Sequence, residues 1–146
     1  MRYLLPTVLL SLALAANAGN LERLDQVDLI ELELKTSRAL LVLLLEEDKV
    51  NTRPAMKAVF KKVNNYLDFV ASGQLNEAAP NASATLRPKI VVYGPRDATS
   101  AEMQNLAGLK LAGQKAGVEV EVQPYQPGIR ARPVPIKPVN RHERPG

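Results

Sequence analysis

Apolar residues recur with helical spacing through residues 21–48. Acidic side chains at Glu22, Asp25 and Asp28 occupy the first turns, where a helix dipole favours negative charge. Residues 39–45 are apolar without a break, which predicts a helix buried on more than one side, with a partner-binding surface as the second interpretation. The positions that recur at intervals of three and four residues are Val27, Ile30, Leu34, Ser37, Leu41 and Leu44.

Residues 53–72 predict a second helix, with signals at both of its ends. Asn51 or Thr52 can serve as the N-cap, and Pro54 stands where a first-turn proline is tolerated. Gly73 is a natural C-terminal stop. Since only a short loop separates this helix from the preceding one, we expect the two to pack antiparallel. The apolar stripe of the second helix consists of Met56, Val59, Phe60, Val63, Tyr66, Leu67 and Val70.

The predicted helical hairpin, residues 19–73, has an uneven distribution of charge. Residues 22–48 carry eight acidic and three basic side chains, whereas residues 49–62 carry five basic and no acidic ones. The simplest interpretation is attraction across the hairpin, because charged helix faces are ordinarily solvated or paired. The alternative is an anion site at Lys57, Lys61 and Lys62, since Lys57 and Lys61 lie four residues apart on one helix face and can share a phosphate.

Residues 74–88 have no periodicity and are predicted to be an irregular linker. Residues 89–123 are predicted to form a small βαβ unit, which opens with a run of β-branched residues. Thr99 and Glu102 have the spacing of a capping box at the start of its helix. Valine alternates with glutamate over residues 118–122, as in a strand with one buried face. A unit of this length is expected to be parallel and right-handed.

Residues 124–146 contain six prolines and a net charge of +4, and they are predicted to be disordered or polyproline-like. The predicted fold class is therefore α+β, with an N-terminal antiparallel helical hairpin, a small βαβ unit and a disordered Pro/Arg-rich C-terminal tail. The predicted boundaries are signal peptide 1–18, hairpin 19–73, linker 74–88, βαβ unit 89–123 and tail 124–146.

The first eighteen residues have the layout of a secretory signal peptide. Arg2 supplies a positive charge, residues 4–15 are almost wholly apolar, and Ala16-Asn17-Ala18 has the small-x-small pattern of a cleavage site. The apolar stretch is shorter than the roughly 20 residues of a membrane-spanning helix. We therefore expect export to the periplasm or the medium, after cleavage near Ala18.

Composition excludes several kinds of chemistry. The chain has 146 residues, no Cys and one His, which excludes disulfides, thiolate metal sites and a cysteine nucleophile. No cofactor, metal site or catalytic residue is predicted. Aromatic residues make up only 4% of the chain and Trp is absent, so a base-stacking surface, and with it nucleic-acid binding, is not expected.

Two patterns suggest chemistry elsewhere in the chain, each beside a simpler interpretation. The turn after the first predicted strand precedes a helix N-terminus, and Arg96 can assist an anion there. It lacks both glycine-rich phosphate-binding patterns, however, so a capped turn with a surface Arg–Asp pair is favoured. The carboxylate pairs Glu119 with Glu121 and Asp25 with Asp28 can in principle perform acid–base work, but charged surface positions explain them as well.

The tail is the best candidate for recognition of a partner. Proline holds the backbone extended, so binding costs less entropy, and the segment from Pro135 to Pro138 fits a P-x-x-P pattern whose flanking bases suit an acidic groove. The same tail can act as a spacer, or bind an anionic lipid or cell-wall polymer by charge. The predicted partner-binding residues are Arg130, Arg132, Pro133, Pro135, Lys137 and Pro138.

Together these features favour an exported, non-catalytic binding protein, an accessory or adaptor subunit of a bacterial envelope assembly with a protein partner. The alternative is a small periplasmic hydrolase acting on cell wall or a phosphoester, through carboxylates such as Glu121 or the Arg96 turn. A third hypothesis is a secreted cationic factor whose tail acts on membranes.

Overall fold

A computed structural model of the chain describes residues 20–79 and 85–138. The predicted signal peptide lies outside the described residues, as do residues 80–84 of the predicted linker and residues 139–146 of the tail. In the part that the structure describes, no helix is both long and apolar enough to cross a membrane.

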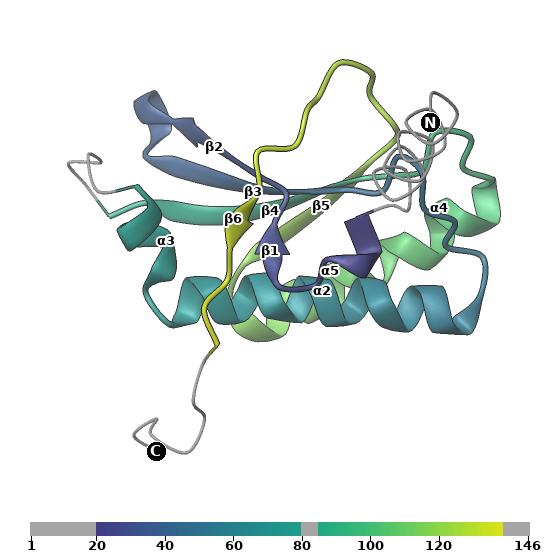
Figure 1. The fold of residues 1–146 in the computed structure, drawn as a ribbon, viewed down its shortest axis with the longest axis horizontal. Helices are drawn as coiled ribbons and strands as arrows, with labels where there is room; N and C mark the ends of the chain where they lie inside the picture. The colour runs from purple at the N-terminus through teal and green to yellow at the C-terminus, as the bar shows by residue number, and fades with distance from the viewer. Residues whose placement is uncertain (1–19, 80–84, 139–146) are drawn as a thin grey trace, which may run out of the picture.

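A mixed sheet is the centre of the fold, and its strands are β2 (Leu29–Glu33), β3 (Arg38–Leu44), β4 (Arg87–Tyr93) and β5 (Glu119–Gln123). The strands lie in this order across the sheet (Figure 1). β2 pairs antiparallel with β3, whereas β3, β4 and β5 are parallel to one another. Because parallel neighbours need a crossover, a helical segment joins each of the two parallel pairs.

The predicted N-terminal helical hairpin is wrong. Its first half instead forms strands, because Ile30 and Leu32 alternate with Glu31 and Glu33 at a period of two. The apolar run that follows is β3, whose residues from Ala39 to Leu44 are mostly buried on both faces of the sheet, and periodicity alone cannot separate such a strand from a buried helix. The elements before β3 are η1 (Asn20–Glu22), β1 (Gln26–Val27), β2 and η2 (Leu34–Thr36).

The turn between β2 and β3 explains how the chain reverses within this segment. η2 ends at Ser37, which has a left-handed backbone conformation with φ of 52°. The Ser37 N–H bonds to the Leu34 carbonyl at 3.4 Å, and the Arg87 N–H bonds to the Ser37 carbonyl at 2.8 Å. A left-handed residue reverses the chain sharply, and for a non-glycine residue it is an uncommon conformation that sequence periodicity does not reveal.

The second predicted helix is confirmed as α2 (Arg53–Ala71), which connects β3 to β4. Thr52 is its N-cap and accepts a hydrogen bond from the Ala55 N–H, with Pro54 in the first turn. After Gly73, with φ of 84°, the short helix α3 (Gln74–Ala78) extends regular structure into the predicted linker. The buried residues of α2 are Val59, Lys62, Val63, Tyr66 and Phe69, so the buried stripe includes a lysine.

Residues 89–123 form a strand, a helical connection and a second strand. The two strands, β4 and β5, belong to the same sheet and pair in parallel as predicted. The helical part is divided at Gly108 into α4 (Ser100–Ala107) and α5 (Leu109–Ala116). The predicted capping box is confirmed, because Thr99 and Glu102 make both reciprocal hydrogen bonds.

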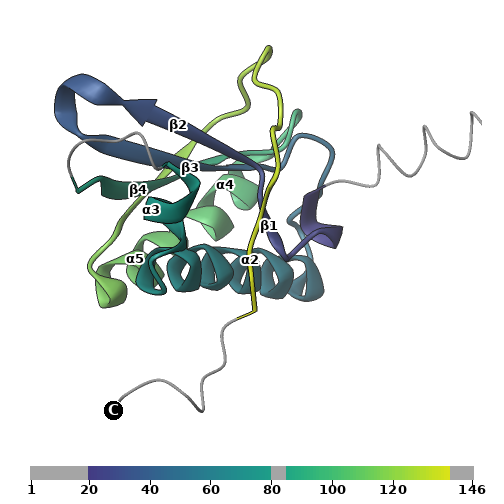
Figure 2. The ribbon, with the colours of Figure 1, turned by 60° about the vertical axis from the view of Figure 1, so that its left-hand side comes forward.

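Helices α2 and α5 cover one face of the sheet, as both ribbon views show (Figures 1 and 2). The core between the layers includes Leu41 and Leu43 of β3, Ile90 and Val92 of β4, and side chains from α2. Residues 124–133 pass over the opposite face and lead into β6 (Val134–Pro135), which pairs antiparallel with β1. The prediction of a disordered tail is therefore wrong for residues 124–138, which we call the C-terminal arm.

Candidate functional site

A buried ion pair holds the arm, the sheet and α2 together. The Nζ atom of Lys62 lies 2.7 Å from Oδ1 of Asp28, and both side chains are fully buried. Oδ2 of Asp28 accepts a hydrogen bond of 2.9 Å from the Leu44 N–H. The pKa of Asp28 is raised, because burial opposes its charge more than Lys62 and the Leu44 N–H favour it.

The hydroxyl of Tyr66 completes this buried cluster. It accepts a hydrogen bond of 2.9 Å from the Asp28 N–H and donates one of 2.9 Å to the carbonyl of Val42. Burial, together with the nearby Asp28 carboxylate, raises the pKa of Tyr66 well above its usual value. The phenol therefore stays protonated and acts as a structural link between α2 and the sheet.

The arm is bound to this cluster and to α3 mainly through its backbone. Its Arg132 N–H donates to the Asp28 carbonyl at 2.7 Å, and its Ile136 N–H donates to the Asp25 carbonyl at 2.8 Å. Gln74 binds both backbone groups of Lys137, accepting from its N–H at 2.7 Å and donating to its carbonyl at 3.1 Å. These contacts define the path of the arm without using its charged side chains.

The side chains of the arm alternate between the core and the solvent. Val134 and Ile136 pack against the hydrophobic core. The residues predicted to contact a partner are all exposed, and they are Arg130, Arg132, Pro133, Pro135, Lys137 and Pro138. Among them, Lys137 pairs with Glu77 at 3.4 Å in an exposed contact. The structure thus brings the predicted residues together on one ordered segment.

Arg96 lies at the carboxyl edge of the parallel strands, as its place after β4 requires. Its guanidinium pairs with Glu46, pairs with Glu47 at 3.1 Å, and stacks on the ring of Tyr125 at 5.0 Å. The hydrogen bond to Glu47 raises the pKa of Arg96. Ligands of open α/β sheets bind at this edge. Here, however, the cation is already matched by two carboxylates, which weakens its attraction for an added anion.

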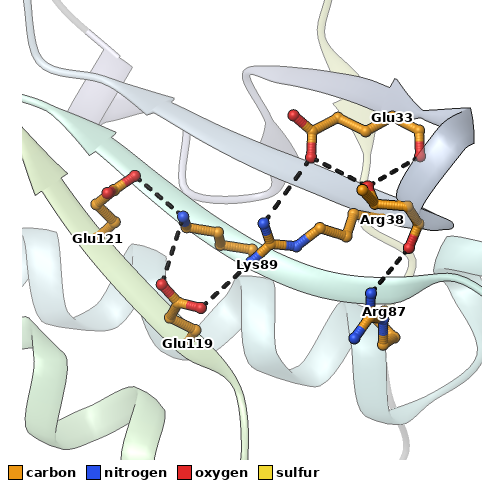
Figure 3. A network of polar contacts seen from close by, with 7 residues as sticks. Glu33, Arg38, Arg87, Lys89, Glu119 and Glu121 are labelled. Atoms are coloured by element: carbon orange, nitrogen blue, oxygen red, sulfur yellow. Dashed lines mark hydrogen bonds and ion pairs between the residues drawn. The ribbon is translucent and has the colours of Figure 1, made fainter.

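A second set of charges lies on the sheet around Lys89 (Figure 3). The Nζ atom of Lys89 lies 3.3 Å from Glu119 and 3.2 Å from Glu121, and Arg38 also pairs with Glu119 at 3.3 Å. Burial opposes the charge of Lys89, but its hydrogen bonds to Glu121 and Glu119 raise its pKa. The bond from Lys89 lowers the pKa of Glu121, the opposite of what a general acid needs.

Of the other predicted anion residues, Lys57 and Lys61 are exposed on the outer side of α2. Lys62 is instead buried and paired with Asp28, so the prediction that it binds an added anion is wrong. Beside them, a groove of about 800 Å³ runs between α2 and α5, with Phe60, Leu67 and Leu111 among its lining residues. The structure thus leaves Arg96 and the two lysines in separate places: the arginine at the sheet edge, the lysines on the helix layer. Together they do not form a single site.

Sequence reasoning places Asp28 in an acid–base pair and Lys62 in an anion site, and it finds neither their contact with each other nor the contact of Gln74 with the arm. A signal for Lys62 exists, since this lysine is four residues before Tyr66 and seven before Phe69, on the buried side of α2. Nothing comparable marks Gln74, whose role depends on a segment more than sixty residues away in the chain. Within residues 20–79 and 85–138, no group of three or more acidic or histidine side chains is placed to hold a metal ion.

Comparison with protein-family models, with curated proteins and with solved structures found no match to this chain.

Proposed function

We propose that this chain is an exported, non-catalytic binding protein, an accessory or adaptor subunit of a bacterial envelope assembly, whose protein partner contacts the C-terminal arm. One observation supports the proposal most. The arm is bound along the body by its backbone, while its basic and proline side chains point to solvent. A segment already held in its bound form loses less entropy when a partner docks.

The charge of the arm indicates the chemistry of that partner. Arg130 and Arg132 are exposed, and no ion pair of either is found among the described residues. Guanidinium groups bind carboxylates in a bidentate geometry, so an acidic surface on the partner suits this segment. Pro133 and Pro135, which follow these arginines, present a fixed apolar surface without side-chain entropy to lose. Export, through the predicted signal peptide, would place the partner in the envelope.

The test is crosslinking in the native envelope, with a charge-removal variant. Arg130→Gln, Arg132→Gln and Lys137→Gln are combined in one chain, and formaldehyde adducts are compared with those of the unaltered protein. We expect one discrete protein adduct that is lost in this variant. The matched control, Lys57→Gln with Lys61→Gln and Lys110→Gln, removes the same charge from exposed helix positions and keeps the adduct.

Two results would contradict the proposal. The first is an adduct that survives removal of the three arm charges, because the arm is then not the contact. The second is the absence of a protein adduct together with binding of the full chain to phosphatidylglycerol vesicles that the triple variant loses. That result would assign the arm to an anionic lipid in place of a protein.

A further inference from the structure

Among the described residues, three large hydrophobic side chains are exposed, and they lie on two different surfaces. Leu32 and Leu34 are 44% and 75% exposed in the β2–β3 hairpin, and Leu111 is 63% exposed on α5. Both ribbon views show the hairpin end at the sheet layer, away from the outer side of α5 (Figures 1 and 2). A single copy of the chain therefore does not cover one surface with the other.

The hairpin end is a firmly built projection. The Ser37 N–H closes the turn on the Leu34 carbonyl, and Arg87 donates from its side chain to the Thr36 carbonyl at 2.9 Å. Leu34 stands at this end between an acid, Glu33, and a base, Lys35, all three exposed. A rigid apolar side chain between two opposite charges has the form of a binding knob, because little entropy is lost when it is covered.

The groove between α2 and α5 has the complementary form. It encloses about 800 Å³, and its apolar lining includes Phe60, Leu67 and Leu111. A base, Lys115, is also among its lining residues. An apolar groove beside a base matches an apolar knob beside an acid.

We propose that the hairpin end of one copy of this chain docks in the α2–α5 groove of a second copy, with Leu34 against Leu111. Glu33 then faces the partner copy's Lys115. This contact joins two different surfaces, so the first copy keeps a free groove and the second copy keeps a free knob, and the assembly grows as a chain. The proposal is independent of the proposed contact at the C-terminal arm.

The contact is small, so we expect weak, concentration-dependent association. Sedimentation velocity of the purified protein up to about 1 mM is the measurement, since this range detects dissociation constants in the high micromolar region. Leu34→Glu removes the knob, and Leu111→Glu removes the groove. Both side chains are largely exposed, so neither change empties the core. Gln114→Glu, an exposed position on the same helix as Leu111, is the control and associates like the unaltered protein.

Mixing the two variants tests the pairing of the surfaces. Each variant alone is expected to be a monomer, with association weakened at least about tenfold. An equimolar mixture is expected to form a 1:1 complex and nothing larger, because the Leu111→Glu copy keeps its knob and the Leu34→Glu copy keeps its groove. A charge exchange adds a second test: Glu33→Lys and Lys115→Glu each weaken association, and the two changes in one chain restore it.

Three results would overturn the proposal. The first is the absence of association of the unaltered protein at every concentration in the range. The second is a leucine variant that associates as tightly as the control. The third is a mixture of the two variants that forms no complex, which would mean that like surfaces contact each other. Loss of the arm adduct described above would leave all these outcomes unchanged, so the two proposals fail separately.

Discussion

The ammonium group of Lys62 lies 2.7 Å from the carboxylate of Asp28, and neither side chain is exposed to solvent. This pair joins the middle of α2 to the start of β2 and, through the Asp28 carbonyl, to the N–H of Arg132 in the arm. Removal of one partner from a buried pair leaves the other charge without compensation. The positions of α2, the start of β2 and the arm relative to one another therefore depend on this pair.

Lys62→Met is expected to lower the free energy of unfolding by about 3–5 kcal/mol, the usual cost of breaking a buried ion pair. Urea denaturation followed by circular dichroism measures the change. Asp28→Asn combined with Lys62→Met should recover part of the loss, because no unpaired charge is then buried. Lys61→Met, at an exposed position next along α2, is the control. A loss below about 1 kcal/mol for Lys62→Met would contradict the assignment.

Glu102 is predicted to make the stability of the protein sensitive to acid. Hydrogen bonds from the N–H groups of Val50, at 2.9 Å, and Thr99, at 3.1 Å, favour its carboxylate. They lower the pKa of Glu102 from its ordinary value of 4.5. Its stabilisation is therefore present above pH 4.5 and lost as the pH falls through the lowered pKa.

Glu102→Gln should consequently reduce the free energy of unfolding at pH 7 and should lose less stability on acidification below pH 4.5 than the unaltered protein. Urea denaturation at a series of pH values measures both effects. Glu77→Gln, which changes an exposed carboxylate, should leave the profile nearly unchanged. Parallel profiles for Glu102→Gln and the unaltered protein would show that Glu102 is not the group responsible.

Two glycines of the second crossover are predicted to respond in opposite ways to alanine. A Cβ atom at Gly113 would collide with the carbonyl oxygen of Val118 and with the side chain of Val120. At Gly108 the nearest atoms would be 3.6 Å and 3.9 Å away, in ordinary contact, and the backbone there is helical. The close approach of α5 to β5 thus depends on Gly113 alone of the two.

Gly113→Ala should therefore destabilise the protein by about 1–3 kcal/mol through overpacking. Gly108→Ala should be neutral or stabilise it by up to about 1 kcal/mol, because alanine favours helix. Thermal and urea denaturation of both variants check the pair. Equal changes in the free energy of unfolding for Gly113→Ala and Gly108→Ala would argue against the close packing of Gly113 on β5.

Gln74→Ala is predicted to release the C-terminal arm while leaving the sheet intact. The change removes both hydrogen bonds to the Lys137 backbone, and it should cost about 1–2 kcal/mol. Hydrogen exchange should accelerate at the Ile136 and Arg132 amides, whereas the Val50 amide serves as an unaffected reference. Gln126→Ala, at an exposed position of the arm, is the control. Unchanged exchange at Ile136 would mean that Gln74 does not hold the arm.

The sequence predicted those features of the fold that depend on residues close together in the chain. The cap at Thr52, the capping box from Thr99 to Glu102 and the two strands within residues 89–123 follow from the sequence, because each depends on local hydrogen bonds or a local period. The parallel pairing of these strands follows from the length of the connection between them. The same reasoning from local periods predicts a helix where the first strands lie. Their apolar run is buried on both faces, and this leaves no period that could distinguish a strand from a buried helix.

In the candidate site, too, local features were predictable from the sequence and long-range contacts were not. The proline and arginine content of the arm predicts a disordered segment and gives no information on its path, because composition does not reveal backbone contacts. The bonds that order the arm come from Gln74 and from the backbone of Asp25 and Asp28. Backbone groups have no sequence signature, so a segment bound in this way has the composition of a disordered one.

By itself the sequence determined where α2 and α4 begin. It also excluded the reactions that need cysteine side chains, because the chain has none. Only the tertiary structure decided that Asp28 and Lys62, 34 positions apart, share one buried contact, and that Gln74 binds the backbone of Lys137 across 63 positions. The physical reason is the range of the interactions. Caps, turns and periodicity act within a few residues, whereas burial and pairing of charge depend on which segments the fold brings together.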